Sequence, residues 1–296
     1  MISKYVNQTK SSMMVLGLTL ITALTGCAEK NFEAVPSTDG PKVVGTPRPT
    51  PPPGCTTDNV DKIYRPTKIL FVVDTSGSNV NVTANYGSTP NCGNGGLCTP
   101  PTDPNKDFRG GAISDFLARF RHKTNFSWGF NTFSANRSIA YINSGSEDSP
   151  IFSDNPNSMN TALNRFNNSS DSGNTPYRQA VNLAAKAIED DPDKNDTEKP
   201  NYFVILLTDG YPTDYVNQDG SLQEDAVKAD LNALLAKAPG QVNLSTIYYG
   251  QGNDPRAIAL LKEMSEIGAG QFANVNDPNS DFKIDDVIPG SNNGCK

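Results

Sequence analysis

The chain has few of the side chains on which hydrolytic catalysis depends. Its 296 residues include one histidine, His122, so a Ser-His-Asp triad or a Cys-His pair has only one candidate base. That histidine lies at the basic end of an expected helix, where we expect it to be solvated. No Gly-x-Ser-x-Gly turn, Walker A phosphate loop or Gly-x-Gly-x-x-Gly motif occurs. The sequence therefore predicts a protein that is not an enzyme.

Basic residues are also fewer than acidic residues. The chain has 25 Lys and Arg against 32 Asp and Glu, which gives a formal net charge of −7 and a pI of about 4.8. This balance, without a run of basic residues, disfavours nucleic acid and anionic lipid headgroups as partners. Hydrophobic residues make up 36% of the chain. Part of that low value comes from Pro-, Gly-, Asn- and Ser-rich stretches that are typical of loops and linkers.

The uncharged stretch near the start of the chain is too short to cross a bilayer as a helix. Met13 to Leu24 follows Lys4 and Lys10 and spans about a dozen residues, whereas a transmembrane helix needs roughly 20. A short apolar stretch after positive charges is typical of an export signal. We therefore predict a signal peptide at residues 1–26.

The end of this segment, Leu24-Thr25-Gly26-Cys27, resembles the lipobox of bacterial lipoproteins. The resemblance implies that Cys27 becomes the lipid-modified N-terminus of the mature chain. Ala28, in place of Asp, implies sorting to the outer membrane under Gram-negative rules. An ordinary secretory signal with a chance cysteine is the alternative.

Cysteine is scarce, and the four others are Cys55, Cys92, Cys98 and Cys295. Four cysteines allow three pairings. Cys92 and Cys98 bracket a Gly-Asn-Gly-Gly turn and are the expected local pair. Cys55 and Cys295 would then join the two ends of the folded domain. A zinc site is the alternative, but the spacings do not match Cys-x-x-Cys pairs.

Proline divides the chain into a linker and a folded domain. Residues 27–54 are proline-rich, which favours an extended polyproline-II spacer after the lipidated cysteine. A proline-motif ligand for another protein is the alternative. We expect the folded domain at residues 55–296.

Apolar runs and amphipathic segments alternate through this domain. Its fully apolar runs predict buried parallel strands, and its 3.6-residue periodicities predict helices. The expected helix caps are Asn155 or Asp154, Thr175 and Asp254. We expect strands at residues 68–73, 126–132, 138–142, 202–207, 242–248 and 271–275, and helices at 108–121, 156–167, 176–189, 222–237 and 255–267. This order predicts a doubly wound α/β fold. Its six-stranded sheet is mostly parallel with one antiparallel edge strand, and has helices on both faces.

Three polar segments lie in the loops of this predicted fold, two of them directly after buried strands. Open α/β sheets bind ligands outside the carboxyl ends of their strands. They are Asp74-Thr75-Ser76-Gly77-Ser78, Gly173-Asn174-Thr175 and Thr208-Asp209-Gly210. Together they resemble the D-x-S-x-S, G-x-T and T-D-G segments of the metal-ion-dependent adhesion site. That site occurs in von Willebrand factor A (VWA) and integrin I domains. The resemblance covers about residues 60 to 290 and implies the VWA, Rossmann-like fold.

The resemblance also implies a set of metal ligands: Asp74, Ser76, Ser78, Thr175 and Asp209. Oxygen ligands of this kind suit Mg²⁺, or Mn²⁺ or Ca²⁺. A carboxylate from a protein or surface ligand is then expected to complete the metal shell. A phosphatase with an Asp nucleophile is disfavoured, because those motifs have a second Asp where this chain has Ser76. Each residue taken alone also suits a turn or helix cap.

The segment at about residues 79–107 is expected to be a long insertion without regular structure, next to the metal loop. It either contributes to a ligand-recognising rim or is an exposed decoration. The resemblance implies that the last helix, at 255–267, moves when the metal shell changes.

These observations predict a metal-dependent, adhesion-type binding protein, lipid-anchored in the cell envelope at the outer membrane. The alternative is a structural or assembly lipoprotein whose metal only stabilises the sheet edge. Both the periplasmic and the exposed face of the outer membrane are compatible with this sequence.

Overall fold

The computed structural model describes residues 65–81, 83–84, 98–251, 253–275 and 283–288. The signal peptide, the linker, Cys27 and three of the four remaining cysteines lie outside these ranges. Lipidation and both disulfide pairings therefore stay predictions. Within the described ranges, no helix combines the length and apolar character needed to cross a membrane.

A six-stranded sheet forms the centre of the domain, in the order β5-β4-β1-β6-β7-β8. Every neighbouring pair is parallel except β4 and β5, which form an antiparallel hairpin at one edge. The central strand β1 is buried along its whole length, as its apolar sequence predicts. The strands are β1 (Thr67–Asp74), β4 (Phe126–Ser134), β5 (Arg137–Ala140), β6 (Asn201–Thr208), β7 (Val242–Tyr248) and β8 (Ala269–Asn274). The predicted fold class is confirmed.

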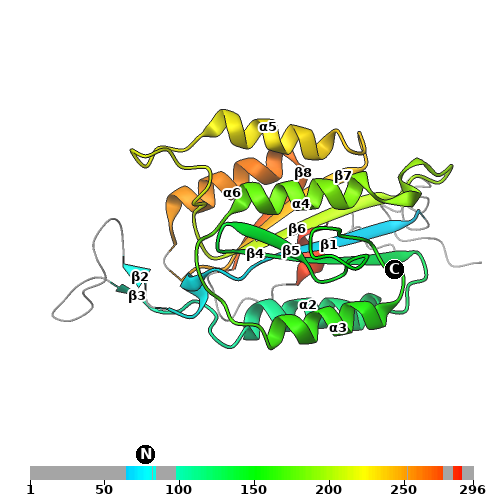
Figure 1. Ribbon diagram of the computed structural model, residues 1–296, viewed down its shortest axis with the longest axis horizontal. Helices are drawn as coiled ribbons and strands as arrows, with labels where there is room; N and C mark the ends of the chain where they lie inside the picture. Colours follow the sequence, from blue (N-terminus) through cyan, green and yellow to red (C-terminus); the bar gives the residue numbers. More distant parts are fainter. Residues whose placement is uncertain (1–64, 82, 85–97, 252, 276–282, 289–296) are drawn as a thin grey trace, which may run out of the picture. The chain divides into compact units, whose positions relative to one another are not determined.

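Helices cover both faces of this sheet, as Figure 1 shows. On one face lie α2 (Asp107–Phe120) and α3 (Pro156–Asn167), and on the other α4 (Tyr177–Glu189), α5 (Glu224–Leu235) and α6 (Pro255–Ile267). Each face has its own apolar core. Short 3₁₀ turns are η1 (Gly77–Asn79), η2 (Pro192–Asn195) and η3 (Ile284–Val287).

Two of the three expected helix caps are confirmed. Asn155 accepts a hydrogen bond from the Asn157 amide, and Asp254 accepts one from the Arg256 amide. Thr175 is not a cap, because α4 starts one residue later than expected and Pro176 occupies the cap position without a side-chain bond. The Gln179 amide instead donates to the carboxylate of Asp214, which reaches α4 from a distant loop.

The insertion at 79–107 is not entirely irregular. Its ends carry a two-stranded antiparallel pair, β2 (Thr83–Ala84) and β3 (Cys98–Thr99). Strands of two residues have no alternation that a sequence pattern would reveal. This pairing holds the two ends of the segment 85–97 next to each other.

A buried ion pair lies at the start of β1. Lys68 is 3% exposed, and its Nζ lies 3.1 Å from Asp191 Oδ1 and 2.5 Å from Asp193 Oδ2. The hydroxyl of Tyr202 donates to the other oxygen of Asp191 at 2.7 Å. Lys68 can therefore be buried near the start of the mostly apolar central strand, because two carboxylates satisfy its charge.

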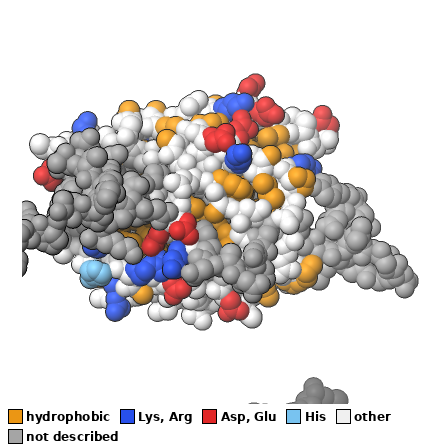
Figure 2. Space-filling view, turned by 180° about the vertical axis from the view of Figure 1, so that it is seen from behind, with side chains coloured by type: hydrophobic (Ala, Val, Ile, Leu, Met, Phe, Trp, Pro, Cys, Tyr) orange, Lys and Arg blue, Asp and Glu red, His pale blue; other side chains and the backbone are white. Residues whose placement is uncertain are grey.

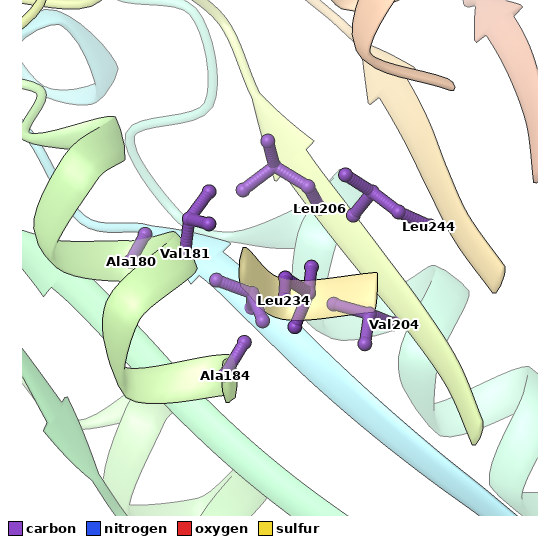
Figure 3. A pocket seen from close by; sticks show the side chains of 8 residues that line it. Ala180, Val181, Ala184, Val204, Leu206, Leu234 and Leu244 are labelled. Carbon is purple, nitrogen blue, oxygen red and sulfur yellow. The ribbon is translucent and has the colours of Figure 1, made fainter. Parts of the chain in front are cut away.

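A small apolar cavity of about 10 Å³ lies between α4, α5 and the sheet (Figure 3). Its lining includes Ala180, Val181, Leu234 and Leu206. A volume of this size is at the lower limit for one water molecule, and an apolar lining leaves such a cavity dry. The cavity is therefore a packing defect and offers no room for a ligand.

We expect Leu206→Ala to lower the free energy of unfolding by about 3–5 kcal/mol, because the truncation enlarges an existing void. Chemical denaturation measures this loss. Leu235→Ala, at a partly buried position on α5, is the control and should cost less than half as much. Equal losses for the two variants would contradict tight packing around Leu206.

Candidate metal centre

Two parallel neighbours, β1 and β6, bring their carboxyl ends to the same edge of the sheet. Strand β1 ends at Asp74, and β6 ends at Thr208, directly before Asp209. The turn η1 follows β1, so Ser76 and Ser78 lie at this edge too. The fold therefore collects four of the five predicted ligands at one place.

Asp74 is fully buried and both of its carboxylate oxygens are engaged. The Ser76 amide donates to Oδ1 at 2.7 Å, and the Thr208 hydroxyl donates to Oδ2 at 2.6 Å. Thr208 also accepts a hydrogen bond from the Tyr177 hydroxyl at 3.2 Å. These bonds fix the Asp74 carboxylate between the loop after β1 and the end of β6.

The two serines and Asp209 form a continuous polar chain. Ser76 Oγ lies 3.1 Å from Ser78 Oγ, and Ser78 Oγ donates to Asp209 Oδ1 at 2.8 Å. The two hydroxyls therefore face the same space, as their spacing on a tight turn predicts. Asp209 Oδ2 is buried and has no hydrogen-bond partner among the described residues. A buried carboxylate oxygen without a partner is costly, and a cation would satisfy it.

Thr175 approaches the same edge through its backbone. The Thr213 amide, from the loop after Asp209, donates to the Thr175 carbonyl at 3.0 Å. Thr175 Oγ1 lies 3.8 Å from the position that a Cβ would take on Gly210. Thr175 is 7% exposed. Its hydroxyl is thus placed beside the Asp209 loop, although it does not join the hydrogen bonds between the serines and Asp209.

The loop that carries Thr175 depends on a glycine. Gly173 has a φ of +75°, and a Cβ there would lie 2.7 Å from the Cβ of Ala135. The Gly173 carbonyl accepts a hydrogen bond from the Gly77 amide at 2.9 Å, which ties this loop to η1. Only glycine meets both demands, a left-handed backbone and a close neighbour. The glycine of the G-x-T segment therefore has a structural cause here.

Burial acts on both carboxylates of the site, and the charge of Asp209 also acts on Asp74. Burial, followed by the negative charge of Asp209, raises the pKa of Asp74 to about 7. Burial also raises the pKa of Asp209, and the side chains of Ser78 and Thr102 and the positive charge of Arg109 oppose the shift. Two carboxyl groups are thus held close together at low exposure, and Asp74 retains its proton to a higher pH than an exposed carboxyl would. A positive ion beside them would oppose both shifts, because it favours the ionised form of each carboxylate.

The donor set fits a hard divalent cation. It has two carboxylates and three hydroxyls, all oxygen ligands of the kind that Mg²⁺ and Mn²⁺ accept. Throughout the described part of the chain, no three His, Cys, Asp or Glu side chains gather to hold a metal. A metal at this edge would therefore rely on Ser76, Ser78 and Thr175 as well as on the two carboxylates.

Sequence reasoning missed the polar side chains beneath this site. They are Asp103, Lys106, Arg109 and Asp171, each at most 6% exposed. In the first turn of α2, Arg109 is fully buried, whereas the neighbouring Phe108 is only partly buried. A single sequence does not reveal which carboxylates compensate a buried arginine, because they lie in loops far along the chain.

His122 is exposed, as expected. It is the single histidine, drawn pale blue on the surface in Figure 2, next to Lys and Arg side chains. It follows the last turn of α2, whereas Arg109 in the first turn contacts Asp74. Fourteen helical residues span about 20 Å, so this side chain lies well away from the candidate site.

No protein-family model matches the chain, and no curated protein matches it in sequence. Solved structures similar to it include the von Willebrand factor type A protein from Catenulispora acidiphila, at 12% identity and a TM-score of 0.44. That match covers 72% of this chain and 39% of the other. The PilB minor pilin from Streptococcus sanguinis is 14% identical, with a TM-score of 0.46, over 71% of this chain and 57% of the pilin.

The manganese-loaded TRAP protein of Plasmodium vivax is 19% identical, with a TM-score of 0.41, over 67% of this chain and 63% of that protein. In all three matches the chain spans less than two thirds of the other protein's length. Likenesses at this level carry no argument about function. The assignment of the site therefore depends on its own residues and geometry.

We expect the metal-free protein to lose stability as pH rises from about 4 to about 7. The native state retains a proton on Asp74 up to a pKa of about 7, whereas an unfolded Asp releases it near 3.9. The native state thus binds more protons in this window, and the free energy of unfolding falls with pH. Denaturation in a chelator should show a loss of about 3 kcal/mol between pH 5 and pH 8.

Asp74→Asn should reduce the slope of this pH profile, because the amide does not titrate, whereas the raised pKa of Asp209 still contributes. Asp115→Asn removes an exposed carboxylate on α2 and should retain the wild-type slope. A wild-type stability that is constant or rises between pH 5 and pH 8 would contradict the raised pKa of Asp74.

Proposed function

We propose that this chain is a divalent-metal-dependent binding protein of the adhesion type. One Mg²⁺ or Mn²⁺ binds at the sheet edge through Asp74, Ser76, Ser78, Thr175 and Asp209. A carboxylate from a partner protein or surface ligand completes the shell. The observation that supports this most directly is the buried, unpartnered Oδ2 of Asp209 beside two convergent serine hydroxyls.

The chemistry of the ligand set explains why such a site would bind an acidic partner. Three of the five ligands are neutral hydroxyls, and five ligands do not complete an octahedral shell, so the cation retains a position for a further oxygen ligand. Mg²⁺ also retains water ligands, which a carboxylate displaces. The metal thereby permits a chain of net charge −7 to bind an acidic ligand, which its surface charge alone disfavours.

The proposed setting is the cell envelope. The lipobox-like segment supports a lipid anchor at Cys27, and residues 27–54 would hold the domain away from the membrane as an extended spacer. Ala28 supports the outer membrane. We infer no enzymatic activity, in agreement with the exposed position of His122 and its distance from the site.

The burial of the ligands favours a second candidate function. Asp74, Ser76, Thr175 and Asp209 are each at most 7% exposed. An ion at this depth would relieve the repulsion between two carboxylates whether or not a partner binds. The chain would then be a structural or assembly lipoprotein of the envelope, in which the metal only stabilises the sheet edge.

Calorimetric titration of the mature chain, residues 27–296 with Cys27→Ser, tests the metal site. We expect saturable binding of one Mn²⁺ or Mg²⁺, with an increase in Tm, and loss of both in Asp74→Ala and Asp209→Asn. Asp115→Asn should bind like the wild type. Wild-type protein that binds neither ion, with or without acetate to complete the shell, would eliminate both functions.

Adhesion to cells or matrix in Mg²⁺ or in chelator separates the two functions. The adhesion function predicts binding that requires both the metal and Asp74. If the metal raises the Tm of the wild type but adhesion is the same in chelator, the stabilising role is the correct one.

The insertion provides a further prediction for the adhesion function. Because β2 and β3 pair directly, a two-residue Asn-Gly turn can replace residues 85–97, with Cys98→Ser to avoid a free thiol. We expect unchanged Mn²⁺ affinity and weaker adhesion, if this segment contributes to the rim that recognises the ligand. Wild-type adhesion after the replacement would identify the segment as a decoration.

A further inference from the structure

Arg109, in the first turn of α2, is fully buried directly beneath the candidate metal site. Its Nε donates to Asp103 Oδ2 at 2.9 Å, and Nη2 donates to the Asp103 carbonyl at 2.9 Å and to Asp171 Oδ2 at 2.7 Å. Its Nη1 donates to the backbone carbonyl of Asp74 at 2.5 Å. One guanidinium thus connects three separate segments of the chain.

Two of these segments carry proposed metal ligands. Asp74 is itself a ligand, and Arg109 contacts it through the backbone. Asp171 lies four residues before Thr175 in the loop that follows α3. The neighbouring amide of Ser172 donates to the Thr75 carbonyl at 2.9 Å, so the two loops also meet directly. Arg109 spans the junction between them.

Aromatic rings and a second set of hydrogen bonds restrict this guanidinium. Its carbon lies 5.4 Å from the centre of the Phe166 ring and 5.8 Å from that of Tyr249. The Tyr249 hydroxyl donates to Asn79 Oδ1 at 2.9 Å, and Asn79 Nδ2 donates to the Ser76 carbonyl at 3.2 Å. The far end of the serine-bearing turn is therefore tied to the ring that packs against Arg109.

We propose that Arg109 is a positioning residue for the metal centre. It holds the loop of Asp74, Ser76 and Ser78 and the loop of Thr175 at the separation that lets both contribute oxygens to one ion. This inference rests on the proposed metal binding. It assigns to a buried arginine, outside the ligand set, the alignment of two ligand loops.

The role is one of geometry more than of charge. Lys106 Nζ lies 3.3 Å from the second oxygen of Asp171, so two cations, Lys106 and Arg109, face two anions, Asp103 and Asp171. The formal charges of this group cancel. Arginine is required because its planar fork reaches three acceptors at once, which a lysine ammonium on a flexible stem does not reproduce.

Arg109→Lys separates these two contributions, because it retains the charge and removes the fork. The first readout is amide hydrogen exchange of the metal-free mature chain, below the unfolding transition of every variant. We expect the amides of Gly77 and Ser172, which bond across the two loops, to exchange at least about tenfold faster, since local opening sets this rate. The second readout is Mn²⁺ affinity, which should fall about 10- to 100-fold.

Lys68→Met is the matched control. It breaks a different buried ion pair, that of Lys68 with Asp191. Lys68 lies in β1, six residues before Asp74 and about 20 Å away along the strand. We expect this variant to lower the Tm but to retain wild-type exchange at Gly77 and Ser172 and wild-type Mn²⁺ affinity. The comparison separates alignment of the loops from a general loss of stability.

Each outcome decides the proposal. Arg109→Lys with wild-type exchange at both amides, or with faster exchange but wild-type Mn²⁺ affinity, would overturn it. If Arg109→Lys does not fold, Asp171→Asn, which preserves shape and weakens the same contact, must show the same two changes. Faster exchange in a protein whose wild type binds no Mn²⁺ would support Arg109 as the link between the loops and reject the proposed metal function.

Discussion

The proximity of two buried carboxylates, those of Asp74 and Asp209, is the main constraint on the structure of this sheet edge. Asp74 and Asp209 occupy the ends of neighbouring parallel strands, where the fold removes both from water. Hydrogen bonds and a retained proton offset part of the resulting negative charge, and part of it stays uncompensated. Hydroxyls of Thr208 and Ser78 donate to the carboxylates, a proton is held on Asp74 to higher pH than usual, and one oxygen of Asp209 is left without a hydrogen bond. Such a combination is costly for folding alone, and the proposed cation would compensate it.

The surrounding structure is arranged to keep that edge in place. Gly173 lets the second loop approach η1, and Arg109 connects the same loops from below. The opposite end of β1 has its own buried pair, between Lys68 and Asp191. The central strand is therefore held by polar contacts at both ends and by apolar cores on both faces. A strand held at both ends provides a rigid support for the proposed metal ligands that follow it.

The sequence was sufficient for the parts of the protein that depend on local pattern. Apolar runs predicted the strands, and their alternation with helices predicted a parallel sheet whose carboxyl ends carry Asp74 and Asp209. It was insufficient where partners are distant in sequence. Arg109 and Asp171 are 62 residues apart, and no periodicity joins them. The capping role given to Thr175 failed for a similar reason, because Asp214, from a loop beyond β6, binds the first turn of α4 instead. Short pairs such as β2 and β3 are below the length at which alternation is visible.

The pairing of β2 with β3 has a consequence for how such a domain can diversify. Residues 84 and 98 are paired neighbours in β2 and β3. The pairing of these strands therefore fixes both ends of the segment between them. Doubling the length of a loop whose ends are already fixed costs only about 0.6 kcal/mol. Changes in this segment therefore have little effect on the loops that carry Asp74 and Ser76, although it begins a few residues after them. The segment next to the site can therefore change in length and sequence during evolution while the proposed metal ligands stay unchanged.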